Sequence, residues 1–362
     1  MTETKPMRLI CRFTTACLLC LIAVSAACVG TPSESVQNPG STAGPEPSAK
    51  IRIGFSMDTL KEERWQKDRD LFVARAQELG AEVLVQSADG NDATQLRQVE
   101  SLLVQGIDVL VVIPHNAEVA ASIVNAAKQS NVPVVSYDRL IKNSDVDLYI
   151  SFDNEKVGEM QGRYLAERAP TGNYILIGGA PTDNNAKMFR EGQMRILQPY
   201  IDRKEIKIVA DQWARDWLAE EAMKHTENAL TVGSDDVAAV LASNDATAGG
   251  AIQALARVGL ASKVLVSGQD ADLAALQRII AGTQTMTVYK PVSILAVRAA
   301  EASVSIAKGE PVQTDRTVNN GKVDVRSILL QPILVDRANL DATVIKDGFH
   351  RREDVYKNAP SN

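Results

Sequence analysis

Short groups of polar residues recur along the chain, and each combines a carboxylate with an amide or a cation. They include Glu63-Arg64-Trp65, Asp138-Arg139, Asp183-Asn184-Asn185, Ser243-Asn244-Asp245 and Gln269-Asp270. Carboxylates accept hydrogen bonds, whereas Arg, Lys and Asn donate them, so such a set can pair with hydroxyl groups, which do both. This pattern favours the binding of a small uncharged polar molecule, such as a sugar, over catalysis.

Tryptophan is scarce, and its positions add a flat apolar surface to this chemistry. Aromatic residues make up only 4% of the chain, yet Trp65, Trp213 and Trp217 all lie beside polar groups. Two indole rings on opposite walls could hold the C–H face of a pyranose ring. Trp213 closely follows an expected strand and is interpreted as a core residue. Trp65 lies among charged residues and fits a ligand wall or a core equally well.

Ordinary structural roles account for several of these residues when each is taken alone. Arg190 and Lys290 would usually be solvated or paired with a carboxylate. The polar residues that open helices could simply be caps, namely Asp183, Asn184, Asn244 and Asp245. The binding hypothesis therefore depends on the whole set rather than on any single residue.

Catalytic, metal and nucleic-acid chemistry is disfavoured. The four cysteines all lie in the first 28 residues, at Cys11, Cys17, Cys20 and Cys28. The three histidines are far apart and form no ligand pair. Gly178-Gly179 is a weak dinucleotide cue because no GxGxxG follows, and no P-loop is present. The net charge of −6 argues against a nucleic-acid binder, which needs a basic face. We expect no enzyme activity, metal or cofactor.

The N-terminus is typical of an export signal. Basic residues precede an apolar run from Phe13 to Ala27, which is short for a membrane span but suited to a signal peptide. Small residues then precede Cys28, so residues 1–27 are interpreted as the signal and Cys28 as a lipid-modified first residue. Ordinary cleavage at the same bond is the alternative. Residues 28–50 are rich in Gly, Pro, Ser and Thr and predict a flexible tether.

From Ile51 onward, short apolar runs alternate with segments of helical apolar spacing, which predicts an α/β fold with parallel sheets. The expected strands are 51–55, 82–86, 109–113, 133–137, 148–152, 174–177, 206–210, 237–241, 264–266 and 285–289, and the expected helices include 65–79, 95–105, 117–129, 156–169, 219–230 and 246–258. Ten strands and a natural break near Phe152–Gly158 predict two doubly wound domains, with a (βα)₈ barrel as the alternative. Parallel sheets bind ligands at the carboxyl ends of their strands, which is where the polar groups lie.

Longer strings of sequence resemble the periplasmic xylose-binding proteins of bacterial ABC importers, within the ribose/galactose-type sugar-binding family. The resemblance runs from about Ile51 to His350. It rests on the strings Glu63–Asp70, Tyr137–Arg139, Ser151–Gly158, Asp183–Lys187, Ala242–Gly250, Ser267–Asp272, Met286–Pro291 and Asn319–Val325. Ala214-Arg215-Asp216, just before Trp217, departs from the family pattern.

The resemblance implies a type I periplasmic-binding fold, in which a three-segment hinge joins two domains and the ligand cleft lies between them. The implied crossings lie near Asp153–Asn154, near Lys290–Pro291, and near Asn320–Val325 or shortly after. We therefore expect an N-terminal subdomain of residues 51–153 and 291–322, a C-terminal subdomain of residues 154–290 and 323–350, and a tail of residues 351–362.

The resemblance also implies a site and a function. Trp65 and Trp217 match the family's two ring-stacking tryptophans, and the implied hydrogen-bonding residues are Arg64, Asp138, Asn185, Arg190, Asn244, Asp270 and Lys290. The implied function is to bind D-xylose outside the cytoplasm and deliver it to the membrane permease of an ABC transporter. We expect a monomer, lipid-anchored through Cys28, that does not bind nucleic acid. Alternatives within this class are another pentose or small sugar as ligand, or a membrane sensor kinase as partner.

Two other classes fit the sequence less well. A sugar oxidoreductase would need the cofactor fingerprint that the sequence lacks, and export would separate it from the cytoplasmic cofactor pool. A sugar-responsive repressor would need an N-terminal helix-turn-helix and a basic face.

Overall fold

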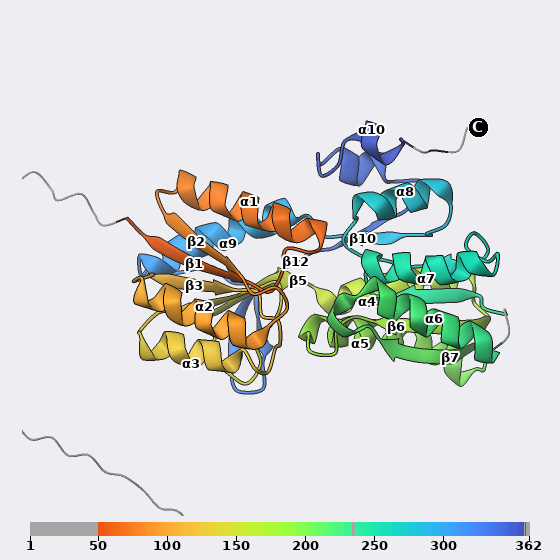
Figure 1. The fold of residues 1–362 in the computed structure, drawn as a ribbon, viewed down its shortest axis with the longest axis horizontal. Coiled ribbons are helices and arrows are strands. Elements are labelled where there is room, and N and C mark those ends of the chain that lie inside the picture. Colours follow the sequence, from red (N-terminus) through yellow and green to blue (C-terminus); the bar gives the residue numbers. More distant parts are fainter. Residues whose placement is uncertain (1–49, 234–235, 358, 360–362) are drawn as a thin grey trace, which may run out of the picture. The chain divides into compact units, whose positions relative to one another are not determined.

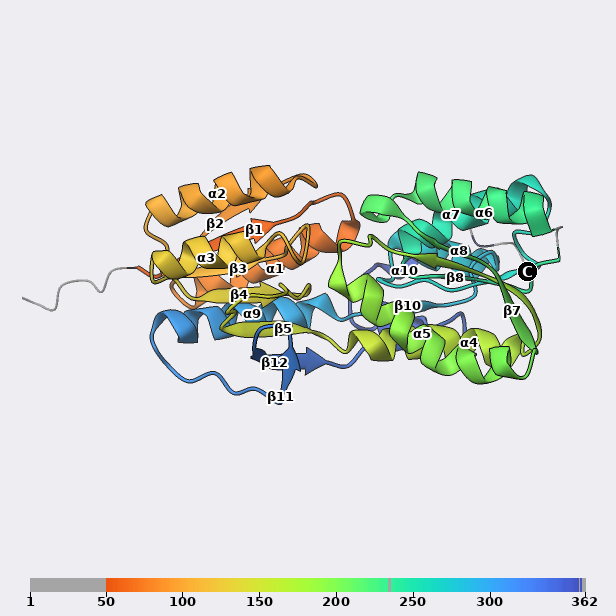
Figure 2. The ribbon, with the colours of Figure 1, turned by 90° about the horizontal axis from the view of Figure 1, so that it is seen from below.

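The computed structural model describes residues 50–233, 236–357 and 359. The expected signal peptide (1–27), Cys28, nearly all of the tether (28–50) and parts of the tail (351–362) lie outside these residues. The described chain forms two α/β lobes that lie next to each other (Figures 1 and 2). The expectation of two doubly wound domains is therefore correct, and the barrel alternative is wrong.

The first lobe is built on a seven-stranded sheet with the order β11-β12-β5-β4-β3-β1-β2. Its strands are β1 (Arg52–Met57), β2 (Glu82–Ser87), β3 (Val109–Val112), β4 (Val134–Tyr137), β5 (Leu148–Phe152), β11 (Arg316–Asn319) and β12 (Asp324–Leu330). All neighbouring pairs are parallel except β11 and β12, which form an antiparallel edge hairpin. The helices are α1 (Glu63–Glu78), α2 (Asp92–Val104), α3 (Ala121–Gln129) and α9 (Val292–Ala307).

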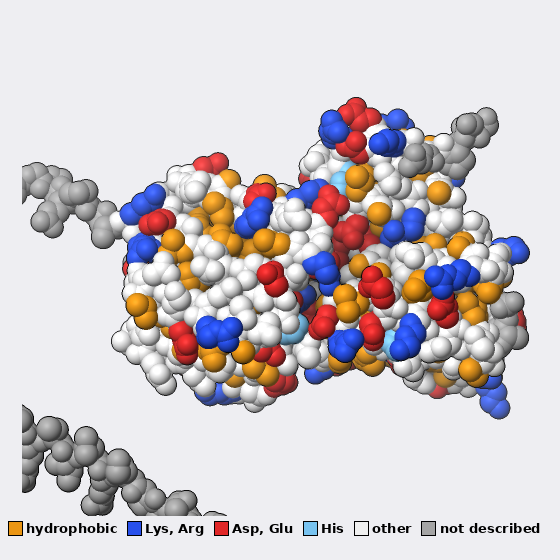
Figure 3. Space-filling view, in the orientation of Figure 1, with side chains coloured by type: hydrophobic (Ala, Val, Ile, Leu, Met, Phe, Trp, Pro, Cys, Tyr) orange, Lys and Arg blue, Asp and Glu red, His pale blue; other side chains and the backbone are white. Residues whose placement is uncertain are grey.

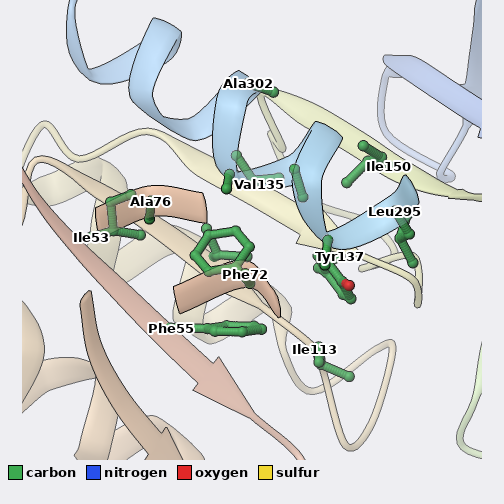
Figure 4. Packing of buried hydrophobic residues seen from close by; sticks show 14 of the residues in the cluster. Ile53, Phe55, Phe72, Ala76, Ile113, Val135, Tyr137, Ile150, Leu295 and Ala302 are labelled. Atoms are coloured by element: carbon green, nitrogen blue, oxygen red, sulfur yellow. The ribbon is translucent and has the colours of Figure 1, made fainter. Parts of the chain in front are cut away.

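Both faces of this sheet are buried, which explains why its central strands are continuous apolar runs. In β3, Val109 and Val111 join the core beneath α1 and α9, whereas Leu110 and Val112 join the core beneath α2 and α3. This division follows from the alternation of side chains along a strand. Figure 4 shows the first of these cores, where the rings of Phe55 and Phe72 pack with their centroids 4.6 Å apart.

The second lobe repeats this plan on a four-stranded parallel sheet with the order β7-β6-β8-β9. Its strands are β6 (Gly172–Gly178), β7 (Ile206–Trp213), β8 (Ala239–Ala242) and β9 (Leu265–Val266), and its helices are α4 (Asn154–Arg168), α5 (Asn184–Asp202), α6 (Ala219–Gly233) and α7 (Asp245–Arg257). Helices α4 and α5 share one core with the sheet, whereas α6 and α7 share the other.

A smaller core completes the second lobe at its C-terminal side. It joins α8 (Leu273–Ala281) to the antiparallel pair β10 (Thr287–Tyr289) and β13 (Ile333–Val335). The short helical segments η2 (Asp341–Ile345) and α10 (Arg352–Val355) pack on it. Helices α8 and α9 and strands β11, β12 and β13 are additions to the elements predicted above, whereas α5 is the helix expected after Asp183.

The expected domain boundary at residues 322/323 is wrong for strand β12. This strand pairs in parallel with β5 of the first lobe, from Ser327 opposite Tyr149 to Leu330 opposite Phe152. Ile328 lies in the α1–α9 core of the same lobe. Residues 323–330 therefore belong to the first lobe, and the third crossing follows Leu330. The other crossings lie between β5 and α4 and between β10 and α9.

We predict that Gly158→Ala destabilises the second lobe by about 2 kcal/mol. Helices α4 and α5 approach so closely that a Cβ on Gly158 would collide with the main-chain carbonyl of Phe189, which cannot rotate away. The free energy of unfolding would be measured by urea denaturation.

Gly249→Ala in α7 is the matched control, because its added Cβ would meet only the end of the Arg278 side chain and alanine favours the helix. Equal stability of the Gly158→Ala variant and the wild type would contradict the close packing of α4 on α5.

Candidate ligand-binding site

A pocket lies between the two lobes, at the carboxyl ends of their strands. It has an empty volume of about 330 Å³, part of it open to solvent. Its lining comprises Glu62, Arg64, Trp65, Asp138, Arg139, Asp183, Asn185, Phe189, Trp217, Asn244, Gln269, Asp270 and Lys290. Figure 3 shows side chains of both charges gathered along the boundary between the lobes.

Eight of the nine residues predicted for the site line this pocket: Arg64, Trp65, Asp138, Asn185, Trp217, Asn244, Asp270 and Lys290. Arg190, the ninth, does not. Its guanidinium contacts Asp211 and Gln193 and lies over the ring of Trp213, with Cζ 5.0 Å from the centroid.

Arg64 connects three carboxylates around the pocket. It lies in the first turn of α1 with only 2% of its surface exposed. Its guanidinium nitrogens lie 3.1 Å from Asp68 Oδ2, 2.9 Å from Asp138 Oδ2 and 3.5 Å from Asp270 Oδ1. Asp270 belongs to the second lobe, so this residue connects the two lobes. Removing Arg64 would leave three buried carboxylates without this shared cation, which is costly.

Lys290 reinforces the same group of charges from the crossing after β10. Its Nζ lies 3.6 Å from Asp138 Oδ2 and 3.6 Å from Asp270 Oδ1. Burial alone would raise the pKa of Asp138, but the cations Arg64 and Lys290 outweigh it and lower this pKa to about 2. Asp138 is therefore a charged acceptor at neutral pH.

The backbone of Asp138 is held in an unusual conformation that aims this carboxylate. Its φ is +59°, in the left-handed region that non-glycine residues seldom occupy. Three side chains donate hydrogen bonds to its carbonyl, namely Tyr149, Ser151 and Asn185. Such conformations persist only where the surrounding structure enforces them, and they concentrate at functional sites.

Arg139 forms a second connection between the lobes. Its Nη1 lies 2.6 Å from Asp58 Oδ2 in the first lobe, and its Nε lies 2.8 Å from Asp183 Oδ2 in the second. Burial raises the pKa of Asp183 despite the opposing effect of Arg139. Asp183 also accepts a hydrogen bond from the indole Nε1 of Trp217 at 3.3 Å, so the second connection reaches an aromatic wall.

The two indoles of the pocket come from different lobes and are positioned in different ways. Trp65 lies on α1, with the guanidinium carbons of Arg64 and Arg139 4.2 and 5.3 Å from its ring centroid. Trp217 ends the short turn η1 (Arg215–Trp217), where Asp216 and Trp217 have φ of +52° and +58°. Lys61 of the first lobe donates a hydrogen bond to the Asp216 carbonyl at 2.8 Å, so both lobes support this turn.

Gly178 and Gly179 provide space for indole rings. A Cβ on Gly179 would overlap the ring of Trp217, and a Cβ on Gly178 would overlap the ring of Trp213. This pair was a weak dinucleotide cue in the sequence, and its role is close approach of aromatic side chains. Trp213 is partly buried against the core of the second lobe, as its interpretation as a core residue requires.

The lining is nearly balanced in charge and retains free hydrogen-bonding capacity. It holds three cations (Arg64, Arg139 and Lys290) and four carboxylates (Glu62, Asp138, Asp183 and Asp270). Glu62 Oε2 and Gln269 Oε1 are buried and have no hydrogen-bond partner among the residues that the structure describes. Unpaired buried acceptors are costly, and hydroxyl groups of a ligand would satisfy them.

Asn244 shows that capping and binding are compatible roles. Its side chain accepts a hydrogen bond from Thr247 N at 2.9 Å and caps α7, while the residue also lines the pocket. Asp183 likewise caps α5 through Asn185 N.

Five lining residues were not predicted for the site: Glu62, Arg139, Asp183, Phe189 and Gln269. Four of them, Glu62, Arg139, Asp183 and Gln269, lie in or directly beside a polar group that also contains a predicted residue. Phe189 follows Asn185 by one turn of helix α5. The signal that could have found the four polar residues is their position in or beside the polar groups after each strand, whereas Phe189 gave no such signal.

The part of the chain that the structure describes contains no group of three or more His, Cys, Asp or Glu residues that could hold a metal ion. Within residues 50–233, 236–357 and 359, no helix is both long enough and apolar enough to span a membrane.

A polar pocket between two doubly wound lobes defines a class of receptors for small ligands, and comparison with known proteins agrees. Residues 53–311 match the family model of the periplasmic binding protein domain. The chain belongs to this family, and the expected type I periplasmic-binding fold is confirmed.

The relatives of this chain include sugar-binding proteins. The chain is 56% identical to the D-xylose-binding periplasmic protein of Escherichia coli (strain K12), over 84% of this chain and 93% of the relative. It is 55% identical to the protein of the same name from Haemophilus influenzae, over 85% and 93%. A carbohydrate transporter solute binding protein from Chloroflexus aurantiacus, solved in complex with D-glucose, superposes with a TM-score of 0.80 at 33% identity, covering 84% of this chain and 98% of that one.

We predict that Asp138→Asn lowers the free energy of unfolding at pH 7 by about 2 kcal/mol. The folded-state pKa of Asp138 lies below its usual value of 3.8, so its ionisation stabilises the fold above that value. This contribution is lost as the pH falls through the folded-state pKa.

The difference between the variant and the wild type should therefore be constant from pH 7 to about pH 5 and shrink below pH 4. Urea denaturation at several pH values would measure it, with the exposed Asp145→Asn as control. A difference that is absent at pH 7, or that grows on acidification, would contradict the proposed role of Arg64 and Lys290 in holding this carboxylate ionised.

Proposed function

We propose that this protein binds D-xylose in the pocket between its lobes and delivers the sugar to the membrane permease of an ABC transporter. The observation that carries the proposal is the lining itself, which combines two indoles from opposite lobes with a charge-balanced set of donors and acceptors. The two relatives at 55% and 56% identity bear the name of D-xylose-binding proteins, which supports this ligand.

A neutral pyranose suits this chemistry better than a charged ligand does. The three cations of the lining already face carboxylates, so no excess positive charge is available for a phosphate or carboxylate ligand. Sugar hydroxyls can donate to Glu62 Oε2 and Gln269 Oε1, which have no hydrogen-bond partner among the described residues. The apolar faces of the ring can then stack on Trp65 and Trp217.

Binding would proceed by closure of the lobes. Arg64, Trp65 and Asp138 lie in the first lobe, whereas Asn185, Trp217, Asn244 and Asp270 lie in the second, so a ligand is fully contacted only when both meet. Such a movement of two lobes is hinge closure around a ligand. The closed form would present a continuous surface of both lobes to the permease, which could then distinguish the loaded receptor from the empty one.

The setting of this function is extracytoplasmic, as for the periplasmic relatives. We propose that residues 1–27 direct export and that Cys28 carries a lipid, so that a monomer works at the outer face of the cytoplasmic membrane. The relatives named above are binding proteins, which supports a role in transport rather than catalysis. Arg190, whose buried Nη2 is unpaired within the described residues, remains a proposed ligand contact.

We predict that Trp217→Ala weakens xylose binding about tenfold to hundredfold, because the ring loses one stacking surface. Tryptophan fluorescence of the purified protein would follow the titration, with calorimetry as an independent measure. Trp213→Phe is the matched control, since Trp213 lies outside the pocket lining and should leave the dissociation constant unchanged. Equal affinities for Trp217→Ala and the wild type would remove Trp217 from the site.

We also predict a preference for xylose over ribose, arabinose, galactose and glucose. A hydroxyl that is missing or misplaced leaves a buried donor or acceptor unpaired, at about 1–3 kcal/mol for each group. The hydroxymethyl group of a hexose must also find space between closed walls. Competition titrations would measure the order of affinities. Comparable binding of glucose, the ligand of the Chloroflexus aurantiacus structure, would refute the proposed specificity while leaving a sugar receptor in place.

A further inference from the structure

A set of contacts between the lobes lies outside the ligand pocket, on a neighbouring face of helix α1. Glu63 and Lys67 are one turn apart on this helix, with Lys67 Nζ 3.2 Å from Glu63 Oε1. Neither residue lines the pocket formed by Arg64 and Trp65. Both reach across to the second lobe, where they meet the start of α8 and the segment Phe349–His350.

Glu63 supplies a helix cap to the other lobe. Its Oε2 accepts a hydrogen bond from the backbone N–H of Leu273, the first residue of α8, at 3.3 Å. The N-cap residue of α8, Asp272, makes no side-chain capping bond of its own. A carboxylate at a helix N-terminus satisfies a free N–H and interacts favourably with the helix dipole. Here that carboxylate comes from the opposite lobe.

The C-terminal segment completes the contact. Lys67 Nζ donates a hydrogen bond to the Phe349 carbonyl at 2.7 Å and lies 3.8 Å from the centroid of the Phe349 ring. His350 lies with Nδ1 3.7 Å from Glu63 Oε1 and Nε2 2.9 Å from the Ala271 carbonyl. Phe349 and His350 are fixed to the second lobe, because Phe349 packs against the α8–β10 core and His350 is buried.

The position of these contacts links them to the ligand pocket. Glu63 directly precedes Arg64, and Ala271 directly follows Asp270. Arg64 and Asp270 form one of the pocket's ion pairs between the lobes, at 3.5 Å. Asp270 and Ala271 both have left-handed backbones, with φ of +98° and +57°, so their conformation depends on surrounding contacts. The same short segments therefore hold the sugar-facing pair on one side and the Glu63 contacts on the other.

We propose that Glu63 is a positioning residue for ligand retention. Together with Lys67, Phe349 and His350 it forms a polar clamp that stabilises the closed arrangement of the lobes and sets how slowly the sugar leaves. This inference rests on the proposed function for the identity of the ligand. Because the clamp forms as the lobes meet, it acts on dissociation and leaves the first encounter with the sugar unchanged.

The test is the kinetics of xylose release from the purified Glu63→Ala variant, measured by stopped-flow tryptophan fluorescence. The dissociation rate constant and the dissociation constant should both rise about fivefold, the effect of losing one helix cap, while the association rate constant stays within about twofold. Glu63→Gln should recover part of the loss, because its amide oxygen can still accept from Leu273 N–H. Glu78→Ala, at the other end of α1 and exposed, is the matched control and should behave as the wild type.

Several outcomes would overturn the clamp. One is a dissociation rate for Glu63→Ala equal to that of the wild type. Another is a fall in the thermal stability of sugar-free Glu63→Ala that is as large as the fall measured with xylose bound. That result would assign Glu63 a purely structural role. If the wild type itself fails to bind xylose, the proposed ligand is wrong, and small-angle X-ray scattering tests the clamp separately. Glu63→Ala should then have a larger radius of gyration than the wild type and Glu78→Ala, and an unchanged radius would overturn the clamp.

Discussion

The site depends on one buried guanidinium. Arg64 contacts Asp68 within its own helix, Asp138 at the end of β4 and Asp270 in the other lobe. An arginine buried this deeply is tolerated only if its charge and its donors are matched, because desolvation of an ion costs several kcal/mol. Asp68 and Asp138 match this charge within the first lobe, and Asp270 adds a third carboxylate from the second lobe, so the full set forms only when both lobes are folded and in contact.

The rest of the pocket holds these charged groups in position. The left-handed backbone of Asp138 is held by hydrogen bonds from Tyr149, Ser151 and Asn185, and the ring of Trp217 lies against Gly179, where any larger residue would displace it. Two sheets with both faces covered by helices make a rigid frame for such conformations. The same rigidity makes closure of the lobes the natural movement, because each lobe keeps its own cores.

Prediction from the sequence was most successful where a signal is local. Continuous apolar strands identified the parallel strands of the two main sheets, and the polar groups after the expected strands contained eight pocket residues. The expected parallel strand 285–289 is instead β10, which pairs antiparallel with β13. Strand β12 was assigned to the wrong lobe because its own residues do not reveal which sheet edge it joins; only pairing with β5, nearly 180 positions away, decides that. The sequence also could not show that the guanidinium of Arg190 contacts Asp211 and lies over Trp213, so its contact with a ligand stays a proposal.

The sequence by itself determined the class of the fold, the absence of cysteine from the body and the residue types available to the pocket, since these follow from composition, periodicity and short motifs. Only the tertiary structure decided which donors meet which acceptors. Arg139 joins Asp58 to Asp183, Glu63 caps a helix of the opposite lobe, and one oxygen each of Glu62 and Gln269 has no partner within the part of the chain that the structure describes. The physical reason is that hydrogen bonds and ion pairs act over about 3–4 Å. At that range, a partner is set by how strands and helices pack and not by its distance along the chain.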